Sequence, residues 1–344
     1  MSPPATTRIR WCSRSTPRGI PCGSWWRRDG PVRRDPERAR GRRGGVVVRA
    51  ERADELLRTG EITLLGQLAR SSNETFLVEV RALASQSVTG TDGDARAGEV
   101  PGPEAAEACL FPAIGDDAAP ADSPVAAPDP DNAAPAARSF GPPDSDTACW
   151  AIYKPELGER PLHDFPPGLY RRERAAYLLS EALGWGIVPL TVIRDDAPFG
   201  TGSLQLFVAA DPREHYFTIV EDHPDTHPVL RAMAAFDVLT NNTDRKSGHV
   251  LRGWDGRIWG IDHGLCFAAA FKLRTVIWEF ARDLLPLDLV ADIAALAENG
   301  APPEVTELLT TEETRALRRR ARALALLGRL PEDPSGMRYP WPLV

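Results

Sequence analysis

The alternation of apolar and polar positions in the first part of the chain predicts a β-hairpin followed by a third strand. Apolar side chains recur through 61–68 and 76–80, and the segment between them is rich in serine, asparagine and threonine, which are typical turn residues. A third apolar run, 149–155, ends at a proline, which cannot continue a central strand. Residues 53–57 predict a short helix before the hairpin. We therefore expect an antiparallel sheet to open the fold.

Helical periodicity first appears after the third strand. Residues 169–183 place apolar side chains on one helical stripe, and Gly184 is expected to end that helix. Two apolar runs, 187–193 and 203–208, then predict further strands. Residues 229–239 are apolar on nearly all sides, which predicts a buried helix.

The last third of the chain predicts one hairpin and then helices. The dipeptide Asp255-Gly256 between two apolar runs is a strong signal for a two-residue hairpin turn. Thr310 and Glu313 have the spacing of a helix capping box, and Gly328 is expected to end that helix. The other predicted elements are the hairpin strands 250–251 and 258–261 and helical segments at 275–285 and 290–298. A sheet-rich half followed by a helical half indicates the α+β class.

Composition changes this picture where periodicity disappears. Residues 1–43 contain twelve arginines against three acidic residues, a local charge of +9, so the remainder carries −16 within the net charge of −7. We expect residues 1–50 to be a disordered Arg-rich segment and residues 86–147, rich in Ala, Pro and Asp, to be a disordered insert. The composition of the Arg-rich segment also resembles that of a transit peptide. Alternatively, the segment results from a start codon assigned too far upstream.

Charge and composition also bear on partners and compartment. The Arg-rich segment could bind nucleic acid or anionic lipid, but the acidic remainder opposes nucleic-acid binding. The basic run 315–322 is either a solvated helix face or a peripheral contact with anionic lipid. No apolar run approaches the roughly 18 residues that a membrane span needs. Five cysteines without a C-x-x-C pair predict neither a disulfide framework nor a zinc site. We expect a cytoplasmic protein.

Lysine is rare in this chain and marks candidate positions for chemistry. Of the 41 basic residues only three are lysine, namely Lys154, Lys246 and Lys272. Arginine has replaced lysine almost everywhere, so a position that keeps the compact ammonium is a candidate for a role that a planar guanidinium cannot fill.

Two carboxylates and one of these lysines form the strongest candidate set. Asp244 lies in a polar loop between the buried helix and the hairpin, and the hairpin leads to Asp262, with Gly264 expected to free the backbone for a sharp turn. Phosphoryl transfer needs one carboxylate near the attacking hydroxyl and one that holds the metal on the nucleotide phosphates. Lys154 on a strand, followed by a helical glutamate, would complete the set. Taken alone, Asp244 reads as a turn or cap residue.

Five segments resemble motifs of a known superfamily, the phosphatidylinositol 3- and 4-kinases, with the type II phosphatidylinositol 4-kinases nearest. Their glycine-rich loop, lysine strand, hinge, catalytic loop and metal loop are similar to residues 71–78, 152–155, 202–208, 242–245 and 261–265. The chain more closely resembles an uncharacterised actinobacterial group with this catalytic domain. In that group the blocks at 153–155, 244–249 and 272–278 recur.

The resemblance implies a two-lobed, protein-kinase-like α+β fold. It implies an antiparallel-sheet N-lobe at 51–208, which holds the disordered insert, and a mostly helical C-lobe at 209–344, with ATP between them. Lys154 would contact the phosphates and Glu173 would hold that lysine, with Glu181 as the competitor for this role. The backbone of Phe207 and Val208 would bind the adenine. The residues expected to cover the phosphates are Ser71, Ser72, Asn73 and Thr75.

The catalytic and metal roles come from the same resemblance. Asp244 would orient the acceptor hydroxyl or take its proton, and Asp262 would bind Mg²⁺. Asp237 is expected to brace the loop, hydrogen-bonded to its backbone amides. Arg245, with the lysine beside it, would either steer an anionic acceptor or neutralise the carboxylates. Lys272 and Arg274 would either read an acceptor phosphate or lie on a solvated helix start.

One position departs from the family. His249 stands where the relatives have an asparagine that binds a second metal, and imidazole suits Mn²⁺ or Zn²⁺ better than Mg²⁺. The site therefore uses one metal, prefers a softer metal or transfers slowly; otherwise the histidine only hydrogen-bonds the loop.

These features predict an ATP- and metal-dependent phosphotransferase acting on a hydroxyl of a phosphoinositide, a protein Ser or Thr, or a small alcohol. The rival prediction is a catalytically weak, nucleotide-binding pseudokinase that acts as a regulatory or interaction protein.

Overall fold

The computed structural model describes residues 51–68, 71, 73–83 and 147–343. All of them belong to one compact unit, Val46–Val344. The Arg-rich segment at 1–50 and nearly all of the insert expected at 86–147 lie outside the described residues, as does Ser72.

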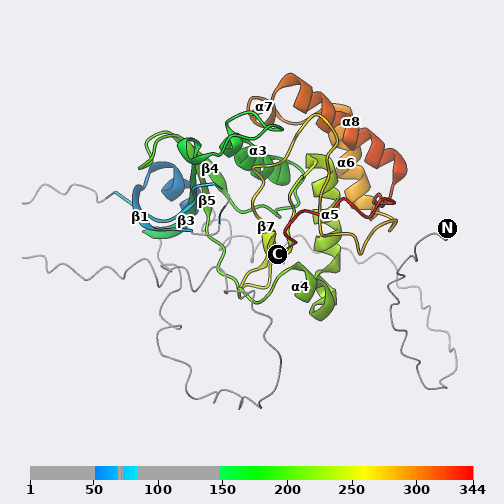
Figure 1. Cartoon of the computed structure of the whole chain (residues 1–344), viewed down its shortest axis with the longest axis horizontal. Helices are drawn as coiled ribbons and strands as arrows, with labels where there is room; N and C mark the ends of the chain where they lie inside the picture. Colours follow the sequence, from blue (N-terminus) through cyan, green and yellow to red (C-terminus); the bar gives the residue numbers. More distant parts are fainter. Residues whose placement is uncertain (1–50, 69–70, 72, 84–146, 344) are drawn as a thin grey trace, which may run out of the picture. The chain divides into compact units, whose positions relative to one another are not determined.

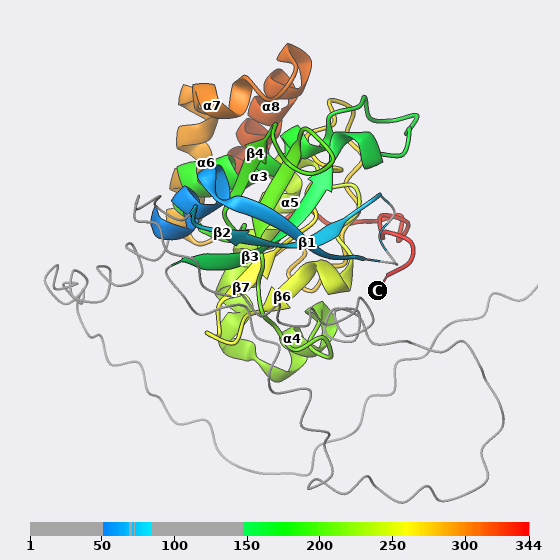
Figure 2. The ribbon, with the colours of Figure 1, turned by 90° about the vertical axis from the view of Figure 1, so that its left-hand side faces the viewer.

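A five-stranded antiparallel sheet follows a short helix at 51–59. The spatial order of its strands is β1-β2-β3-β5-β4, and every neighbouring pair is antiparallel (Figure 2). The strands are β1 (Glu61–Gln67), β2 (Phe76–Arg81), β3 (Ala148–Pro155), β4 (Thr191–Arg194) and β5 (Gly202–Leu206). The predicted hairpin and the predicted third strand are confirmed.

The strand expected at 187–193 is only partly confirmed, because β4 begins at Thr191. The amides of Ile187 and Val188 both donate to the hydroxyl of Ser180, at 2.9 and 3.3 Å, and their side chains pack into the helical core. Pro189 has no N–H to give to a strand ladder. Residues 187–190 therefore do not join the sheet, because contacts with α3 and the helical core satisfy this part of the chain.

Helices make up most of the chain after the sheet. They are α3 (Leu169–Ala182), α4 (Tyr216–Asp222), α5 (His227–Thr240), α6 (Leu287–Asn299), α7 (Pro303–Thr306) and α8 (Thr311–Leu327). A small hairpin of β6 (Val250–Arg252) and β7 (Ile258–Gly260) lies between α5 and α6, which confirms the predicted hairpin. The expected two-residue turn is wrong: residues 253–257 connect the paired Arg252 and Ile258, and the Gly256 amide donates to the Gly253 carbonyl at 2.7 Å. Short 3₁₀ turns are η3 (Glu156–Gly158), η4 (Pro224–Thr226) and η5 (Ser247–His249).

The helix ends show where local signals suffice and where they do not. Thr310 accepts a hydrogen bond from the Glu313 amide, and Gly328 ends α8 with φ 58°, so the predicted cap and stop are confirmed. The helix predicted over 275–285 is wrong. Its backbone is used by distant partners instead, since the amide of Thr275 donates to Arg338 and that of Leu285 donates to Gly328.

Most buried apolar side chains of the described residues belong to two large cores, and Phe165, Leu169 and Ala268 form a third, small cluster. One large core lies within the sheet around Val78, Tyr153 and Leu204, and the other joins α3, α4, α5, α6 and α8 around Phe236. The sheet lies on one side of α3, and α5, α6 and α8 lie on the other (Figure 1). The protein therefore has the predicted α+β character, with an antiparallel sheet followed by helices.

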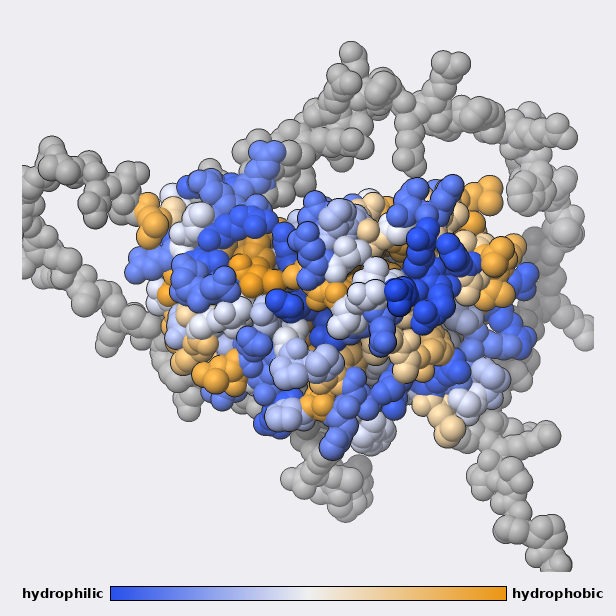
Figure 3. All heavy atoms as spheres, turned by 90° about the horizontal axis from the view of Figure 1, so that it is seen from above, coloured by the Kyte–Doolittle hydropathy of each residue, from blue (hydrophilic) through white to orange (hydrophobic). Residues whose placement is uncertain are grey.

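The outer surface of the helical part is mainly polar. Seen from above in Figure 3, the face that includes α7 and α8 is largely hydrophilic, with small separated hydrophobic areas. Among the described residues, no helix combines the length and apolar character needed to cross a bilayer.

Candidate active site

Lys154 joins the sheet to the helical part through two ion pairs. Tyr153 points into the sheet core, so the next residue on β3 points to the opposite face. The Lys154 ammonium there donates to Glu173 Oε1 at 2.5 Å and to Asp262 Oδ1 at 2.7 Å. Three residues from β3, α3 and the segment after β7 thus meet at one point.

Glu173 is the carboxylate that contacts Lys154, and the alternative, Glu181, does not contact it. Glu173 is buried on α3, and its second oxygen accepts the His263 amide at 2.9 Å. Glu181, two turns further along α3, is exposed. Glu173 therefore ties the lysine to the backbone that follows Asp262.

The backbone at Asp262 itself makes the sharp turn. Asp262 has φ 59°, in the left-handed region that aspartate tolerates better than most residues. Gly264 has no such φ, and a Cβ there would make only ordinary contacts of 3.5 Å. The expectation that Gly264 supplies the turn is wrong, because the strained residue is the candidate metal ligand.

Charge interactions favour the ionised forms of Asp262 and Lys154. Burial would raise the pKa of Asp262, but the charge of Lys154, which also donates a hydrogen bond to this carboxylate, lowers the pKa below its ordinary value. Burial would likewise lower the pKa of Lys154, and the charges of Asp262 and Glu173 raise it instead. The side chain of Asp262 is 45% exposed.

Asp244 lies beside this cluster and is connected to it by a histidine. The His249 ring lies between them, with Nδ1 3.0 Å from the Asp244 carbonyl oxygen and Nε2 3.3 Å from Asp262 Oδ2. The Asp244 carboxylate is 24% exposed, and the Lys246 ammonium lies 3.2 Å from it. Burial, with a smaller contribution from Asp262, raises the pKa of Asp244, while Lys246 opposes that shift. The three residues Lys154, Asp244 and Asp262 are brought together.

The loop that carries Asp244 is shaped by two asparagines whose roles were not predicted. Asn241 ends α5 with φ 53°, and its amide nitrogen donates to the carbonyls of Ala268 and Ala270. The side-chain oxygen of Asn242 accepts the Asp244 amide at 2.9 Å. Asparagine after an apolar helix is a known signal for a left-handed cap, so this feature was available in the sequence.

Arg245 does not reach a surface where an acceptor could touch it. Its side chain is fully buried and pairs with Asp237, which is also fully buried, at 3.0 Å. Arg245 also donates to the carbonyl of Ile261 at 2.8 Å and lies 2.8 Å from His263 Nε2. The expectation that Arg245 steers an acceptor is therefore not supported by its position, and its contacts brace the loop.

Asp237 braces the loop as expected, but through other donors. Its carboxylate accepts hydrogen bonds from the side chains of Asn242, Arg245 and Thr275 at 3.0 to 3.2 Å. Among the described contacts, no backbone amide of the loop donates a hydrogen bond to the Asp237 carboxylate, although such bonds were expected. Side-chain donors fill all of its near positions.

The loop between β1 and β2 places the expected hydroxyls near one another. Ser71 and Thr75 share a hydrogen bond of 2.7 Å, and Thr75 is buried. The side-chain oxygen of Asn73 accepts the Arg160 amide, and the Glu74 amide donates to Gly158. These contacts fix the loop against the segment after β3.

In the segment after β5, one backbone amide already has a hydrogen-bond partner within the protein. The Phe207 amide donates to the carbonyl of Trp150 at 3.0 Å, so it is not free to bind an adenine. The carbonyl of Phe207 and the amide of Val208 have no hydrogen bond within the described part of the chain.

All three lysines form ion pairs with aspartates. Besides Lys154 and Lys246, Lys272 pairs with Asp164 at 2.9 Å and so connects the loop before α3 to the segment that follows residues 261–265. The C-terminal segment is a further neighbour that the sequence did not indicate, because the Leu343 carbonyl accepts the Ser247 amide at 2.8 Å.

Among the described residues, no three His, Cys, Asp or Glu side chains are grouped so as to hold a metal by themselves. Asp262 and His249 are the pair that faces a common point. Any metal here would therefore need further ligands from a bound molecule or water.

No family model matches the chain. Protein Rv2133c of Mycobacterium tuberculosis is 41% identical over 228 residues, which cover 56% of this chain and 81% of that protein. Among solved structures, the Helicobacter pylori proinflammatory kinase CtkA is 13% identical, covering 53% of this chain and 85% of that one, with a TM-score of 0.29. A TM-score of this size carries no argument about the present chain.

Proposed function

This chain belongs to the family of the mycobacterial Protein Rv2133c, and we propose that it is an ATP-dependent phosphotransferase of the phosphatidylinositol 3-/4-kinase-like type. One observation carries the proposal. The Lys154 ammonium bridges Glu173 and Asp262, and Asp244 lies next to them across His249. A lysine, an orienting glutamate and two carboxylates of different exposure are the parts that transfer of a γ-phosphate to a hydroxyl requires.

Lys154 would bind the phosphates of the nucleotide. Its ammonium is held by Glu173, which is fixed in turn by the His263 amide. The side chain is 22% exposed, so one of its three N–H groups can turn toward an incoming phosphate oxygen. Preorganised donors of this kind stabilise the charge that develops during transfer.

Asp262 and His249 would hold a divalent metal. If His249 Nδ1–H donates to the Asp244 carbonyl, its Nε2 lone pair faces the Asp262 carboxylate, an arrangement that a cation between them satisfies. Burial lowers the pKa of His249 to about 4, so the ring is neutral and can act as a ligand at pH 7. A bound metal would neutralise charge on the nucleotide phosphates. Mn²⁺ suits this donor pair better than Mg²⁺.

Asp244 would orient the acceptor hydroxyl and take its proton. Its raised pKa brings the carboxylate closer to the range in which a general base is effective. The Lys246 ammonium, 3.2 Å away, opposes that rise in the Asp244 pKa. The adenine would bind the Phe207 carbonyl and the Val208 amide, while Ser71, Asn73 and Thr75 belong to the loop that would cover the phosphates.

The acceptor is a hydroxyl compound of one of three classes: a phosphoinositide, a protein Ser or Thr, or a small alcohol. The test measures transfer of labelled phosphate from ATP to each class, and to the protein itself, with Mg²⁺ and with Mn²⁺. We expect turnover with wild type, and at least a 100-fold loss for Asp262→Asn, which is about 2.7 kcal/mol of barrier. Asp195→Asn is the matched control, because Asp195 is exposed and lies in a turn. Equal turnover of Asp262→Asn and Asp195→Asn would contradict the proposal.

A second function is favoured by His249 in place of the amide that the related kinases use. Here the protein would bind the nucleotide without transfer and act as a regulator. Thermal stabilisation by ATP with Mn²⁺ that is lost in Asp262→Asn, together with no labelled product from any acceptor class, would select this function over catalysis.

A further inference from the structure

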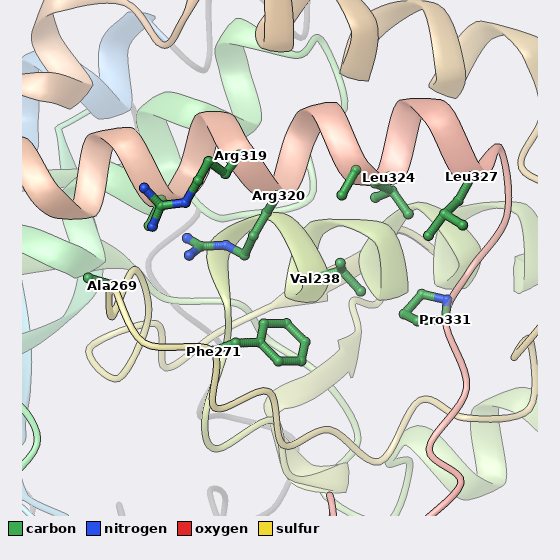
Figure 4. A pocket seen from close by; sticks show the side chains of 10 residues that line it. Val238, Ala269, Phe271, Arg319, Arg320, Leu324, Leu327 and Pro331 are labelled. Atoms are coloured by element: carbon green, nitrogen blue, oxygen red, sulfur yellow. The ribbon is translucent and has the colours of Figure 1, made fainter.

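A groove on the helical part of the molecule shares no residue with the candidate active site. It has a volume of about 340 Å³ and lies between α5, α8 and the segment at 269–271 (Figure 4). This volume falls within the range of roughly 300–1,000 Å³ that is typical of small-molecule sites. The groove is therefore large enough for one small ligand.

The two ends of the groove differ in polarity. Figure 4 shows the guanidinium groups of Arg319 and Arg320 close together at one end, and Val238, Leu324 and Leu327 toward the other. Leu324 is only 1% exposed, so it forms a floor, whereas Leu327 is 57% exposed at the rim. An apolar channel with a cationic end fits a molecule that has an anionic group at one end and an apolar chain behind it.

Arg320 is held in place without a carboxylate partner. Its Nε donates to the Leu239 carbonyl at 2.7 Å and its Nη1 to the Ala268 carbonyl at 3.3 Å. Its Nη2 is buried and has no acceptor among the described residues. Burial lowers the pKa of Arg320 to about 10, which leaves the guanidinium charged at neutral pH.

Arg319 adds a second cation at the same end. Its side chain is exposed on α8, and no ion pair of Arg319 occurs within the part of the chain that the structure describes. Besides burial, the charge of Arg319 lowers the pKa of Arg320, and the Glu313 carboxylate, which is paired with Arg172, opposes that effect. An anionic group between the two guanidinium groups would reduce their mutual repulsion. A carboxylate is well matched to guanidinium donors.

We propose that this groove binds a single-chain amphipathic anion of the fatty carboxylate class. The carboxylate lies against Arg319 and Arg320, and the apolar chain lies along Val238, Leu324 and Leu327. A single chain reaches the buried floor at Leu324, whereas the flat surface of a bilayer would not. Because Arg320 is already fixed by two backbone carbonyls, little side-chain freedom is lost on binding.

The test is calorimetric titration of the full chain with monomeric dodecanoate. Dodecyltrimethylammonium, with the same chain and the opposite charge, and acetate, with the head and no chain, are the comparison probes. We expect saturable binding of one dodecanoate, binding of the cationic probe weaker by at least about tenfold, and no saturation with acetate. Saturation by the cationic probe at equal affinity, or none by dodecanoate, overturns the proposal.

Variants of α8 distinguish the groove from a general surface effect. Ala323 is exposed and lines the groove, so Ala323→Trp fills it without entering the core. We expect Ala323→Trp and Arg319→Ala each to weaken dodecanoate binding by at least about fivefold. Arg322→Ala is the matched control, because Arg322 is exposed on the same helix and does not line the groove. If Arg322→Ala weakens binding as much as Arg319→Ala, the site is not this groove.

Two further measurements separate the remaining outcomes. The inference does not rest on the proposed kinase activity, so Asp262→Asn should bind dodecanoate as wild type does, whatever its turnover. The chain is also sedimented with vesicles of phosphatidylglycerol and phosphatidylcholine. Vesicle binding that Ala323→Trp leaves unchanged, with no saturable binding of dodecanoate, would show a membrane contact instead and overturn the proposal. Thermal unfolding of each variant confirms that α8 stays folded.

Discussion

Two charged clusters lie close together in this molecule and differ in what surrounds them. Lys154, Glu173 and Asp262 form one cluster, and the side chains of Lys154 and Asp262 are 22% and 45% exposed. Asp237 and Arg245 form the other, and both of their side chains are fully buried. Each cluster is built on short ion pairs, so pairing alone does not distinguish a binding site from a structural brace.

The difference lies in how many hydrogen-bonding positions remain open. The Asp237 carboxylate accepts from three side chains and has no contact with solvent. Each Asp262 oxygen has one partner, and the side chain is 45% exposed. A buried pair is stabilising only while both partners are present, whereas an accessible pair can exchange a partner for a ligand. The cluster of Lys154, Glu173 and Asp262 can therefore exchange a partner for a ligand. The pair of Asp237 and Arg245 instead holds the loop that carries Asp244.

The largest expected effect comes from breaking the buried cluster. Asp237→Ala leaves the Arg245 guanidinium buried without its counter-charge, and we expect the free energy of unfolding to fall by about 3–5 kcal/mol. Urea denaturation measures this change. Asp195→Ala, at an exposed turn, should stay within about 0.5 kcal/mol of wild type. A loss below 1 kcal/mol for Asp237→Ala would show that the two clusters do not differ in this way.

Removing the lysine of the accessible cluster should affect the nucleotide more than the fold. Lys154→Met deletes the ammonium that would contact the phosphates, and we expect ATP affinity to fall by about 1.5–3 kcal/mol, the typical strength of a hydrogen bond to a charged group. Nucleotide titration by calorimetry measures it. The loss of unfolding free energy should be smaller than for Asp237→Ala. Unchanged ATP affinity would separate Lys154 from the nucleotide site.

The glutamate that positions this lysine should have a moderate effect. Glu173→Gln keeps the side-chain oxygen that accepts the His263 amide but removes the negative charge beside Lys154, and we expect kcat/KM to fall by about tenfold. Glu181→Gln on the same helix is the control, because Glu181 is exposed and should leave kcat/KM unchanged. Similar losses for both variants would indicate a general effect on α3.

The smallest effect concerns the pH dependence of the reaction. Asp244 must be ionised to accept a proton, so log kcat/KM should rise with pH through the Asp244 pKa and then level off, and burial places that rise above the pH of an ordinary aspartate. Lys246→Ala removes a charge that lowers this pKa, so the rise should move to higher pH. Arg213→Ala, an exposed arginine paired with Asp211, should not move it. A shift to lower pH in Lys246→Ala would contradict the role given to Asp244.

Local sequence signals predicted most elements because each depends on a few adjacent residues. The hairpin around Asp255 and Gly256, the Thr310 and Glu313 cap and the Gly328 stop all lie where the pattern placed them, although five residues rather than two connect the hairpin strands. The apolar runs at 187–190 and 275–285 misled, since their backbone groups bond to Ser180, Arg338 and Gly328, which are distant in sequence. Periodicity carries no information about such partners.

The sequence by itself determined which residue types were available for chemistry. The rarity of lysine singled out Lys154, Lys246 and Lys272, and each of them is paired with an aspartate. The sequence also predicted that Asp244 lies in the loop after a helix and that Asp262 follows a hairpin.

Only the tertiary structure decided which of these charges stay accessible. Arg245 and Lys246 are adjacent in the chain, yet one side chain is fully buried and the other is 18% exposed. The Phe207 amide is committed to Trp150, and Asp262 rather than Gly264 takes the left-handed turn. Burial and hydrogen-bond saturation depend on elements brought together by packing, and no local pattern records them.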